Sequence, residues 1–163
     1  MRRADREVFG QDIFDILDKC EVMRIGLCAG GKPYIVPMNF AYEITEKPAG
    51  AETGLVFYFH CATAGKKLDM IAQNDSVCFE ADCSFGIIKA GQACDWGAEF
   101  ESVMGEGVIG IVAGEAQKIA ALDLIMKRYG FEGKLEYSPE TLAKTAVLRL
   151  RVAGISGKRK KMR

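Results

Sequence analysis

Two adjacent lysines, Lys66 and Lys67, stand where the sequence predicts the first turn of a helix. They follow Gly65 in the run GLVFYFHCATAGKKLDMI, which is typical of an apolar strand, a short turn and a helix. A helix start presents free backbone N–H groups and the positive end of the dipole, so it favours an anion over a cation. The lysines therefore predict a phosphorylated ligand at a strand–helix junction. The plain alternative is a pair of solvated surface charges.

The only histidine of the chain, His60, ends the strand of the same run. Strand alternation places it on one face with Val56 and Tyr58, opposite the apolar Phe57 and Phe59. A lone histidine at a strand end is usually a surface residue or a hydrogen-bonded core residue. Histidine is also the side chain best suited to proton transfer near neutral pH. Because it directly precedes the predicted anion-binding turn, His60 is the candidate catalytic residue.

A second unusual stretch is PYIVPMNF, residues 33–40, in which Pro37 interrupts a clean strand pattern. Proline cannot donate to a strand ladder, so the plain interpretation is an edge strand or a bulge. The functional alternative is that the chain leaves its ladder at residues 36–39. Backbone groups there could then face a planar ligand, such as a flavin ring, whose edge carries donors and acceptors.

Charge is distributed unevenly along the 163 residues. The last six residues, KRKKMR, hold five of the 22 basic residues, which leaves 17 basic against 22 acidic residues elsewhere. A nucleic-acid-binding domain needs a basic face, so this balance argues against nucleic acid as a partner. The N-terminal run MRRADREVFG has no apolar signal core, and no segment approaches the length of a membrane span. We expect a cytoplasmic protein with no membrane partner.

The cysteines form neither a disulfide framework nor a metal-ligand pattern. There are six of them with no CxxC pair, and one histidine is too few for common zinc sites. A chain of this length can bury a core without disulfides, so free thiols in a reducing compartment are expected. No metal site is predicted.

The elements that must position the chemical residues are mostly strands. Hydrophobic alternation predicts strands at 22–28, 34–42, 55–60, 76–82, 85–89, 102–112 and 147–152. A Gly30-Gly31 turn is expected to make a hairpin, and a polar loop at 46–54 a hairpin tip. Helical spacing predicts a first helix with Phe9 to Cys20 along one face, and further helices at 65–74, 115–129 and after Ser138.

Short strands joined by hairpins, with helices between some of them, predict an antiparallel sheet curled into a barrel with helices outside it. The length fits one domain. We place that single domain at residues 1–157 and treat residues 158–163 as a basic, solvated C-terminal tail. Neither βαβ alternation nor a GxGxxG motif is present, so a dinucleotide-binding fold is not expected.

The pairing of PYxVPxxF with a later FHxAxxGKK resembles the FMN-binding split barrels related to pyridoxamine 5′-phosphate oxidase. Within them it is most similar to the nitroimidazole-resistance, nitroreductase-like branch. The matching residues are Pro33, Tyr34, Val36, Pro37, Phe40, Phe59, His60, Ala62, Gly65, Lys66 and Lys67. The resemblance implies a mainly β fold with flanking α-helices, a six-stranded antiparallel split β-barrel.

The same resemblance implies a homodimer with FMN bound at the subunit interface. Lys66 and Lys67 would hold the FMN phosphate, and His60 would lie beside the flavin or a substrate. Ser102 would contribute from a later strand. The residues that would line the flavin ring are Val36, Pro37, Met38 and Asn39.

By this resemblance the protein is an FMN-dependent oxidoreductase that reduces a small aromatic or nitro compound. It is not expected to be a true pyridoxamine phosphate oxidase, because those enzymes resemble one another in a substrate-binding Arg and His near the C-terminus. This chain has no histidine after His60. Two alternatives stay open, namely a non-catalytic flavin-binding protein and a haem-binding split barrel with His60 as the iron ligand.

Overall fold

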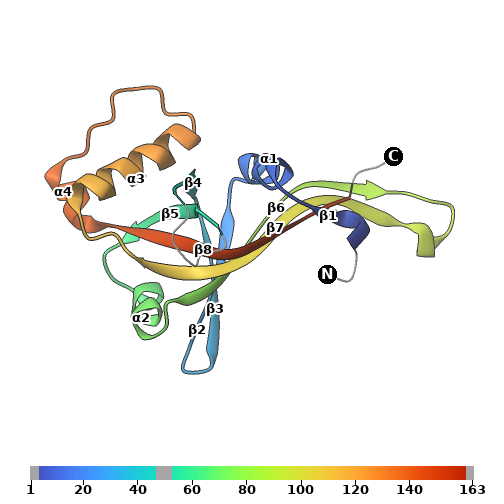
Figure 1. The fold of residues 1–163 in the computed structure, drawn as a ribbon, viewed down its shortest axis with the longest axis horizontal. Coiled ribbons are helices and arrows are strands. Elements are labelled where there is room, and N and C mark those ends of the chain that lie inside the picture. The colour runs from blue at the N-terminus through green and yellow to red at the C-terminus, as the bar shows by residue number, and fades with distance from the viewer. Residues whose placement is uncertain (1–3, 47–52, 161–163) are drawn as a thin grey trace.

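The computed structural model describes residues 4–46 and 53–160, and within them it has one antiparallel sheet of eight strands. The strand order is β3-β2-β6-β7-β8-β5-β4, and β1 pairs with the far end of β8 (Figure 1). The strands are β1 (Glu7–Val8), β2 (Met23–Ala29), β3 (Lys32–Met38), β4 (Ala41–Ile44), β5 (Leu55–Ala62), β6 (Ser76–Ile88), β7 (Gly97–Ile111) and β8 (Thr145–Lys160).

The mainly β, antiparallel split-barrel prediction is confirmed, but the strand count differs. Two of the eight strands are short additions, because β1 has two residues and β4 has four. The sheet does not close, since β3 and β4 form the two ends of the strand order. The two end strands are nevertheless consecutive in the chain, because only Asn39 and Phe40 separate β3 from β4.

Alternation along the strands separates a buried face from an outer face. On β5, Leu55, Phe57 and Phe59 are buried in the core, as predicted from the sequence. The Phe57 ring lies edge-on to the rings of Phe40 and Phe79, with centroids 5.8 and 5.2 Å away. These aromatic contacts connect three segments of the curled sheet and make its core continuous.

The predicted strand at 34–42 is two strands with a break at Asn39 and Phe40. Pro37 lies inside β3 and opposite Arg24 of β2, and pairing continues to Met38. Because β3 has no neighbour on its other side, proline costs no ladder hydrogen bond there. The edge-strand interpretation is therefore confirmed, whereas the prediction that the ladder breaks at Pro37 is wrong.

Two hairpins follow the sequence prediction. Gly30 and Gly31 have φ of 57° and 75°, which is the left-handed region that a two-residue hairpin turn requires. β4 and β5 pair antiparallel, so the loop between them is a hairpin connection, with residues 47–52 outside the described ranges.

Four α-helices lie within the described residues. They are α1 (Gln11–Lys19), α2 (Lys66–Gln73), α3 (Glu115–Arg128) and α4 (Pro139–Lys144). The predicted first helix begins later than expected, because Gly10 at φ 57° turns the chain and leaves Phe9 69% exposed. The predicted Ser138 start of α4 is confirmed, since its side chain accepts from the Thr141 N–H.

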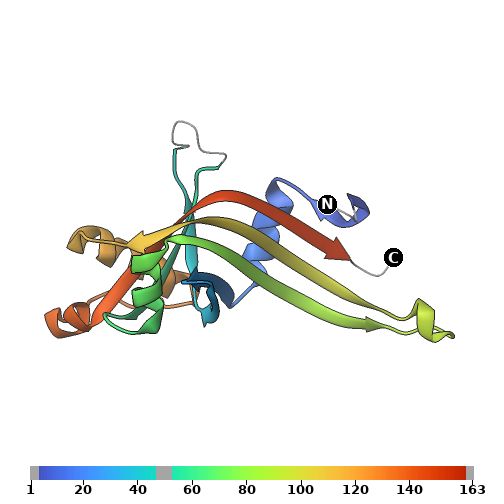
Figure 2. The same cartoon turned by 90° about the horizontal axis from the view of Figure 1, so that it is seen from below.

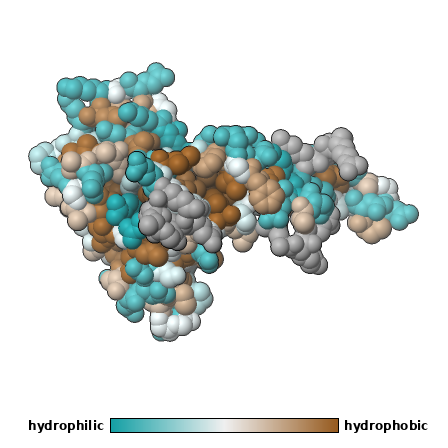
Figure 3. Space-filling model, viewed as in Figure 1, coloured by the Kyte–Doolittle hydropathy of each residue, from teal (hydrophilic) through white to brown (hydrophobic). Residues whose placement is uncertain are grey.

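The helices cover different parts of the sheet. α1 buries Ile13, Ile16 and Leu17 in the main core, whereas α3 and α4 cover a second cluster at the β8 end. That second cluster consists of Val112, Ala121, Leu122, Leu142 and Val147. On the face drawn in Figure 3, hydrophobic residues gather over the middle of the sheet beside α1. No helix of the described ranges is long and apolar enough to cross a membrane.

The predicted solvated tail is wrong for residues 158–160, which are the last part of β8. Lys158 pairs with both Glu7 and Ser102, and Arg159 pairs with Glu101. The Arg159 side chain also bonds the carboxylates of Glu101 and Asp12. Two acidic partners and two neighbouring strands therefore hold a segment whose basic composition suggested a free end.

The predicted strands at 76–82 and 85–89 form one long strand, β6, with a register shift between Cys83 and Gly86. With β7 it extends beyond the rest of the sheet as a two-stranded arm that ends near the 3₁₀ turn Ala93–Asp95 (Figure 2). Trp96 at this tip donates its indole N–H to the Ala90 carbonyl, at 2.8 Å.

Candidate functional site

The start of α2 is an open helix N-terminus directly after β5. Gly65 is the N-cap residue at φ 130°, a conformation that favours glycine, and no side chain caps the helix. The first N–H groups of a helix have no partner inside the helix, so an external acceptor is needed there. The predicted helix start is confirmed at this turn, and its binding of an anion stays a prediction.

Both lysines of that turn reach across to β3. Lys67 is half-buried, and its ammonium lies 3.4 Å from the Met38 sulfur. Lys66 is exposed, with its ammonium 4.1 Å from the centre of the Tyr34 ring, a cation–π contact. The structure thus brings together the two stretches that stood out in the sequence, although four strands separate β3 from β5 in the strand order.

The end of β3 is fixed by the C-terminus of α3. The Tyr129 hydroxyl accepts from the Phe40 N–H at 3.1 Å and donates to the Glu21 carbonyl at 2.5 Å. Arg128 lies over the Phe40 ring, 4.2 Å from its centre, and donates to the Cys20 carbonyl at 2.9 Å. These two residues position the Met38–Phe40 corner.

Sequence reasoning missed this role of α3. Its pattern indicated only that Tyr129 belongs to the apolar face of the helix, next to a glycine C-cap. A hydroxyl at the end of an amphipathic helix carries no local signal of the strand that it will contact about 90 residues away, because that contact depends on how the helix packs.

His60 is exposed on the outer face of β5, where its backbone pairs with Val147 of β8. Its side chain makes no hydrogen bond or ion pair with any residue of the ranges 4–46 and 53–160. Val56 and Tyr58 share its face, as strand alternation predicted. The imidazole is therefore available to an external group rather than engaged in holding the fold.

Ser102 lies apart from the lysines within one chain. It sits on β7 opposite Asp82 and Lys158. β7 is three strands from β3 in the sheet, which corresponds to about 14 Å. Among the predicted site residues, the structure thus brings Lys67 to Met38 of β3. Ser102 lies outside this α2–β3 group, and His60 faces outward from β5.

Arg24 is the basic residue directly opposite Pro37, but its charge is already balanced. Its Nη1 atom lies 3.0 Å from Glu80 and 2.5 Å from Asp82. Hydrogen bonds to these two carboxylates raise the pKa of Arg24, while burial raises the pKa of Glu80. Arg24 is therefore committed to its acidic neighbours, and Lys66 and Lys67 are the cations that can hold an anion here.

The family model for pyridoxamine 5′-phosphate oxidase matches residues 10–159. The chain belongs to this family. No curated protein matches the chain significantly. Among solved structures, a Bacteroides thetaiotaomicron protein provisionally described as a 5-nitroimidazole antibiotic resistance protein has 27% identity and a TM-score of 0.78. The match covers 93% of this chain and 85% of that one, which confirms the resemblance to the nitroimidazole-resistance branch.

Two further members of the fold are more distant in sequence. The flavocytochrome Anf3 of Azotobacter vinelandii has a TM-score of 0.80 at 20% identity, over 99% of this chain and 72% of that one. The FAD and haem binding protein of Mycobacterium smegmatis has a TM-score of 0.77 at 18% identity, over 96% and 74%. At these identities the similarity shows the shared fold.

Proposed function

We propose that this protein is an FMN-binding oxidoreductase that reduces a small aromatic or nitro compound. The observation that carries the proposal is the meeting of Lys66 and Lys67, at the open start of α2, with Tyr34 and Met38 of β3. The similarity to the Bacteroides protein supports a nitro compound as the acceptor class. The lack of any histidine after His60 argues against pyridoxamine phosphate as substrate.

The residues present fit a flavin mononucleotide. A terminal phosphate suits the uncapped first turn of α2 and two ammonium groups, since each supplies hydrogen bonds to an anion. Residues 36–38 lie on the edge strand β3, which leaves backbone groups unpaired on one side, and Asn39 follows directly. Unpaired backbone groups suit the polar edge of a flavin ring. When bound, the flavin supplies the electron transfer, while the protein binds and orients the reactants.

His60 would act on the acceptor rather than on the fold. Its side chain is exposed and has no partner within residues 4–46 and 53–160. In this proposal it orients the acceptor by a hydrogen bond and gives it a proton as it is reduced. This role explains why the single histidine stands just before the phosphate-binding turn.

The proposal includes a homodimer with the flavin at the subunit interface. The outer face of β3, β2, β6 and β7 exposes Ile35 and Met104, which are 67% and 54% accessible in one chain. Exposed apolar side chains on a sheet face are typical of a protein–protein interface. Ser102 lies on that same outer face, so in the dimer it would approach the flavin of the other subunit.

The decisive experiment is spectroscopy of the gently purified protein. We expect flavin absorbance bands, FMN as the flavin released on heating, and bleaching of the bands by a nicotinamide donor followed by recovery on adding a nitroaromatic compound. Absence of bound flavin together with no binding of added FMN would refute the proposal. Release of FAD would correct the cofactor and leave the flavin chemistry in place.

The same experiment separates the two alternatives. A bound flavin that no nicotinamide donor reduces would indicate a non-catalytic flavin-binding protein. A Soret band on haem titration that is lost in His60→Ala would indicate a haem protein. The fold similarity to the flavocytochrome and to the FAD and haem binding protein makes this haem control worthwhile.

A further inference from the structure

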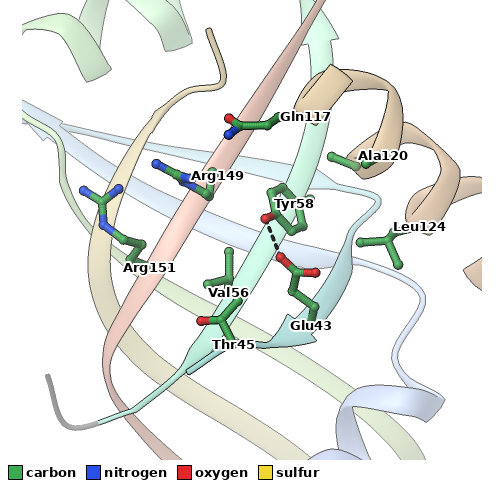
Figure 4. Close-up of a pocket in the computed structure, with 10 residues that line it drawn as sticks. Glu43, Thr45, Val56, Tyr58, Gln117, Ala120, Leu124, Arg149 and Arg151 are labelled. Carbon is green, nitrogen blue, oxygen red and sulfur yellow. Dashed lines mark hydrogen bonds between the residues drawn. The ribbon is translucent and has the colours of Figure 1, made fainter. Parts of the chain in front are cut away.

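A cavity of about 370 Å³ lies between α3 and the outer face of β4, β5 and β8 (Figure 4). The sheet side of this cavity is lined by Glu43, Val56, Tyr58, Arg149 and Arg151. A cavity of this size is large enough for a small metabolite. Its lining includes none of the residues that the proposed flavin site uses.

The two arginines give the cavity a positive end. Arg149 and Arg151 are alternate residues of β8, so their side chains project to the same side of the strand, as Figure 4 shows. Neither guanidinium has a hydrogen bond or ion pair to another residue in the described parts of the chain. Two neighbouring cations without acidic partners repel each other, and an oxyanion between them would remove that repulsion.

Glu43 gives the cavity a negative end. Its Oε1 accepts from the Tyr58 hydroxyl at 2.6 Å. Burial and this hydrogen bond raise the pKa of Tyr58 to about 12, so the phenol keeps its proton and remains the donor. Only one oxygen of Glu43 is engaged in this way, and its second oxygen is free of hydrogen bonds within the described residues.

Strand register sets the separation of the two ends. Glu43, Val56 and Arg151 face one another across β4, β5 and β8. Two strand spacings separate the backbone of Glu43 from that of Arg151, which corresponds to about 9.6 Å. The opposite charges thus lie on either side of the apolar Val56, and Ala120 and Leu124 of α3 line the same space.

We propose that this cavity binds a small zwitterion that carries a phosphate or carboxylate group at one end and an ammonium group at the other. The oxyanion pairs with Arg149 and Arg151, and the ammonium group donates to Glu43. The carbon chain between them lies against Val56 and Leu124. This site is independent of flavin binding, because none of its residues belongs to the α2–β3 group.

Isothermal titration calorimetry with a matched pair of probes tests the proposal. Phosphoethanolamine carries both charges, whereas ethyl phosphate lacks the ammonium group. We expect saturable binding of phosphoethanolamine, and weaker binding of ethyl phosphate. The Arg149→Gln/Arg151→Gln variant should bind both probes about tenfold to hundredfold more weakly, because charge-assisted hydrogen bonds are lost. Glu43→Gln should remove the preference for phosphoethanolamine.

Two control variants distinguish binding in this cavity from binding elsewhere on the protein. Lys134→Gln/Lys144→Gln removes the same charge from exposed ion pairs outside the cavity and should leave the affinity unchanged. Lys66→Ala/Lys67→Ala should also leave it unchanged, which separates this cavity from the proposed flavin phosphate site. If the Arg149→Gln/Arg151→Gln variant fails to fold, Arg149→Lys/Arg151→Lys serves instead, and we expect an intermediate loss of affinity.

Three results would overturn the proposal. One is no saturable binding of either probe to the wild-type protein. Another is wild-type affinity in a folded Arg149→Gln/Arg151→Gln variant. The third is an equal loss of affinity in Lys134→Gln/Lys144→Gln, which would indicate non-specific attraction by surface charge.

Discussion

The two lysines at the start of α2 differ in their exposure and in the side chain that each one contacts. Lys67 is half-buried against the thioether of Met38, and Lys66 lies over an aromatic face. Neither contact supplies a negative charge. An ammonium group that is partly desolvated without a counter-ion is costly, so an anion at this turn would gain from both side chains.

The first prediction concerns these lysines. Lys66→Ala/Lys67→Ala should weaken FMN binding about tenfold to hundredfold, because hydrogen bonds from charged donors to the phosphate are lost. Riboflavin, which has no phosphate, should bind the wild type and the variant equally. Fluorescence quenching of each flavin measures both affinities. Lys134→Ala/Lys144→Ala is the charge-matched control, and full FMN affinity in the α2 variant would refute the phosphate assignment.

The second prediction concerns three tyrosines whose hydroxyls donate to carboxylates. Burial, followed by hydrogen bonds to Asp18, Glu43 and Asp123, raises the pKa values of Tyr42, Tyr58 and Tyr137 to about 12. Because the folded-state pKa lies above the unfolded value, the folded protein holds these protons more tightly. Their contribution to stability is complete below about pH 10 and is lost as the pH rises towards 12.

Urea unfolding at about pH 8 and about pH 11 tests whether these tyrosines lower the unfolding free energy as the pH rises. The wild type should lose more unfolding free energy between the two values than a variant with all three tyrosines changed to phenylalanine. Equal losses in the two proteins would show that other groups cause the alkaline destabilisation.

At the scale of elements, the sequence predicted the turns and helix starts whose conformation depends only on neighbouring residues. The Gly30-Gly31 turn and the Ser138 cap follow from backbone and side-chain chemistry within a few residues. The helix start after Gly65 was predictable for the same reason. The proximity of that helix start to β3 could be expected only from the family resemblance, because it depends on how the sheet curls.

Other elements could not be predicted because distant partners decide them. Residues 158–160 have the composition of a solvated tail, yet Glu101 and Asp12 hold Arg159 and so extend β8. The roles of Arg128 and Tyr129 likewise depend on the packing of α3 against the Met38–Phe40 corner. Charge partners and helix packing are long-range properties that alternation within one segment does not contain.

The third prediction concerns the buried carboxylate that holds this extension. Glu101 is 1% exposed, and it bonds Arg159 and, at 2.7 Å, Lys19 of α1. Glu101→Gln keeps the shape and removes the charge, so it should lower the free energy of unfolding by about 3 kcal/mol. Urea unfolding measures this loss. Glu140→Gln, in the exposed Glu140–Lys144 pair, should change it by less than about 0.5 kcal/mol.

A comparable effect of the two substitutions would show that the Glu101 network contributes no more than a surface pair. A large effect of Glu101→Gln should also appear as faster hydrogen exchange in residues 156–160, because Arg159 would lose one of the two carboxylates that hold it.

At the scale of the whole molecule, the fourth prediction is that two chains associate through the outer sheet face. Ile35→Lys/Met104→Lys places two positive charges on that face. It should raise the dimer dissociation constant at least about 100-fold, because burying an unpaired ammonium group at the interface costs free energy. The monomer fold should remain intact, since both side chains are exposed. Light scattering after gel filtration measures the mass.

Ile44→Lys is the matched control, because Ile44 is 65% exposed on β4 at the other end of the strand order. It should leave the dimer unchanged. A wild-type protein that is monomeric at micromolar concentration, or a dimer that tolerates Ile35→Lys/Met104→Lys, would contradict this arrangement. The first result would also remove Ser102 from the proposed flavin site.

The position of β8 has a consequence for how the chain is made. β8 is the last of the described strands in the sequence, yet it lies between β7 and β5 in the sheet. On the ribosome, the β4–β5 hairpin therefore cannot pair with β8 until residues 145–160 have emerged. Until then, Phe57 and Phe59 cannot be buried in a complete core. Exposed apolar strands are prone to aggregate, so synthesis of this protein should depend on chaperones until β8 has left the ribosome.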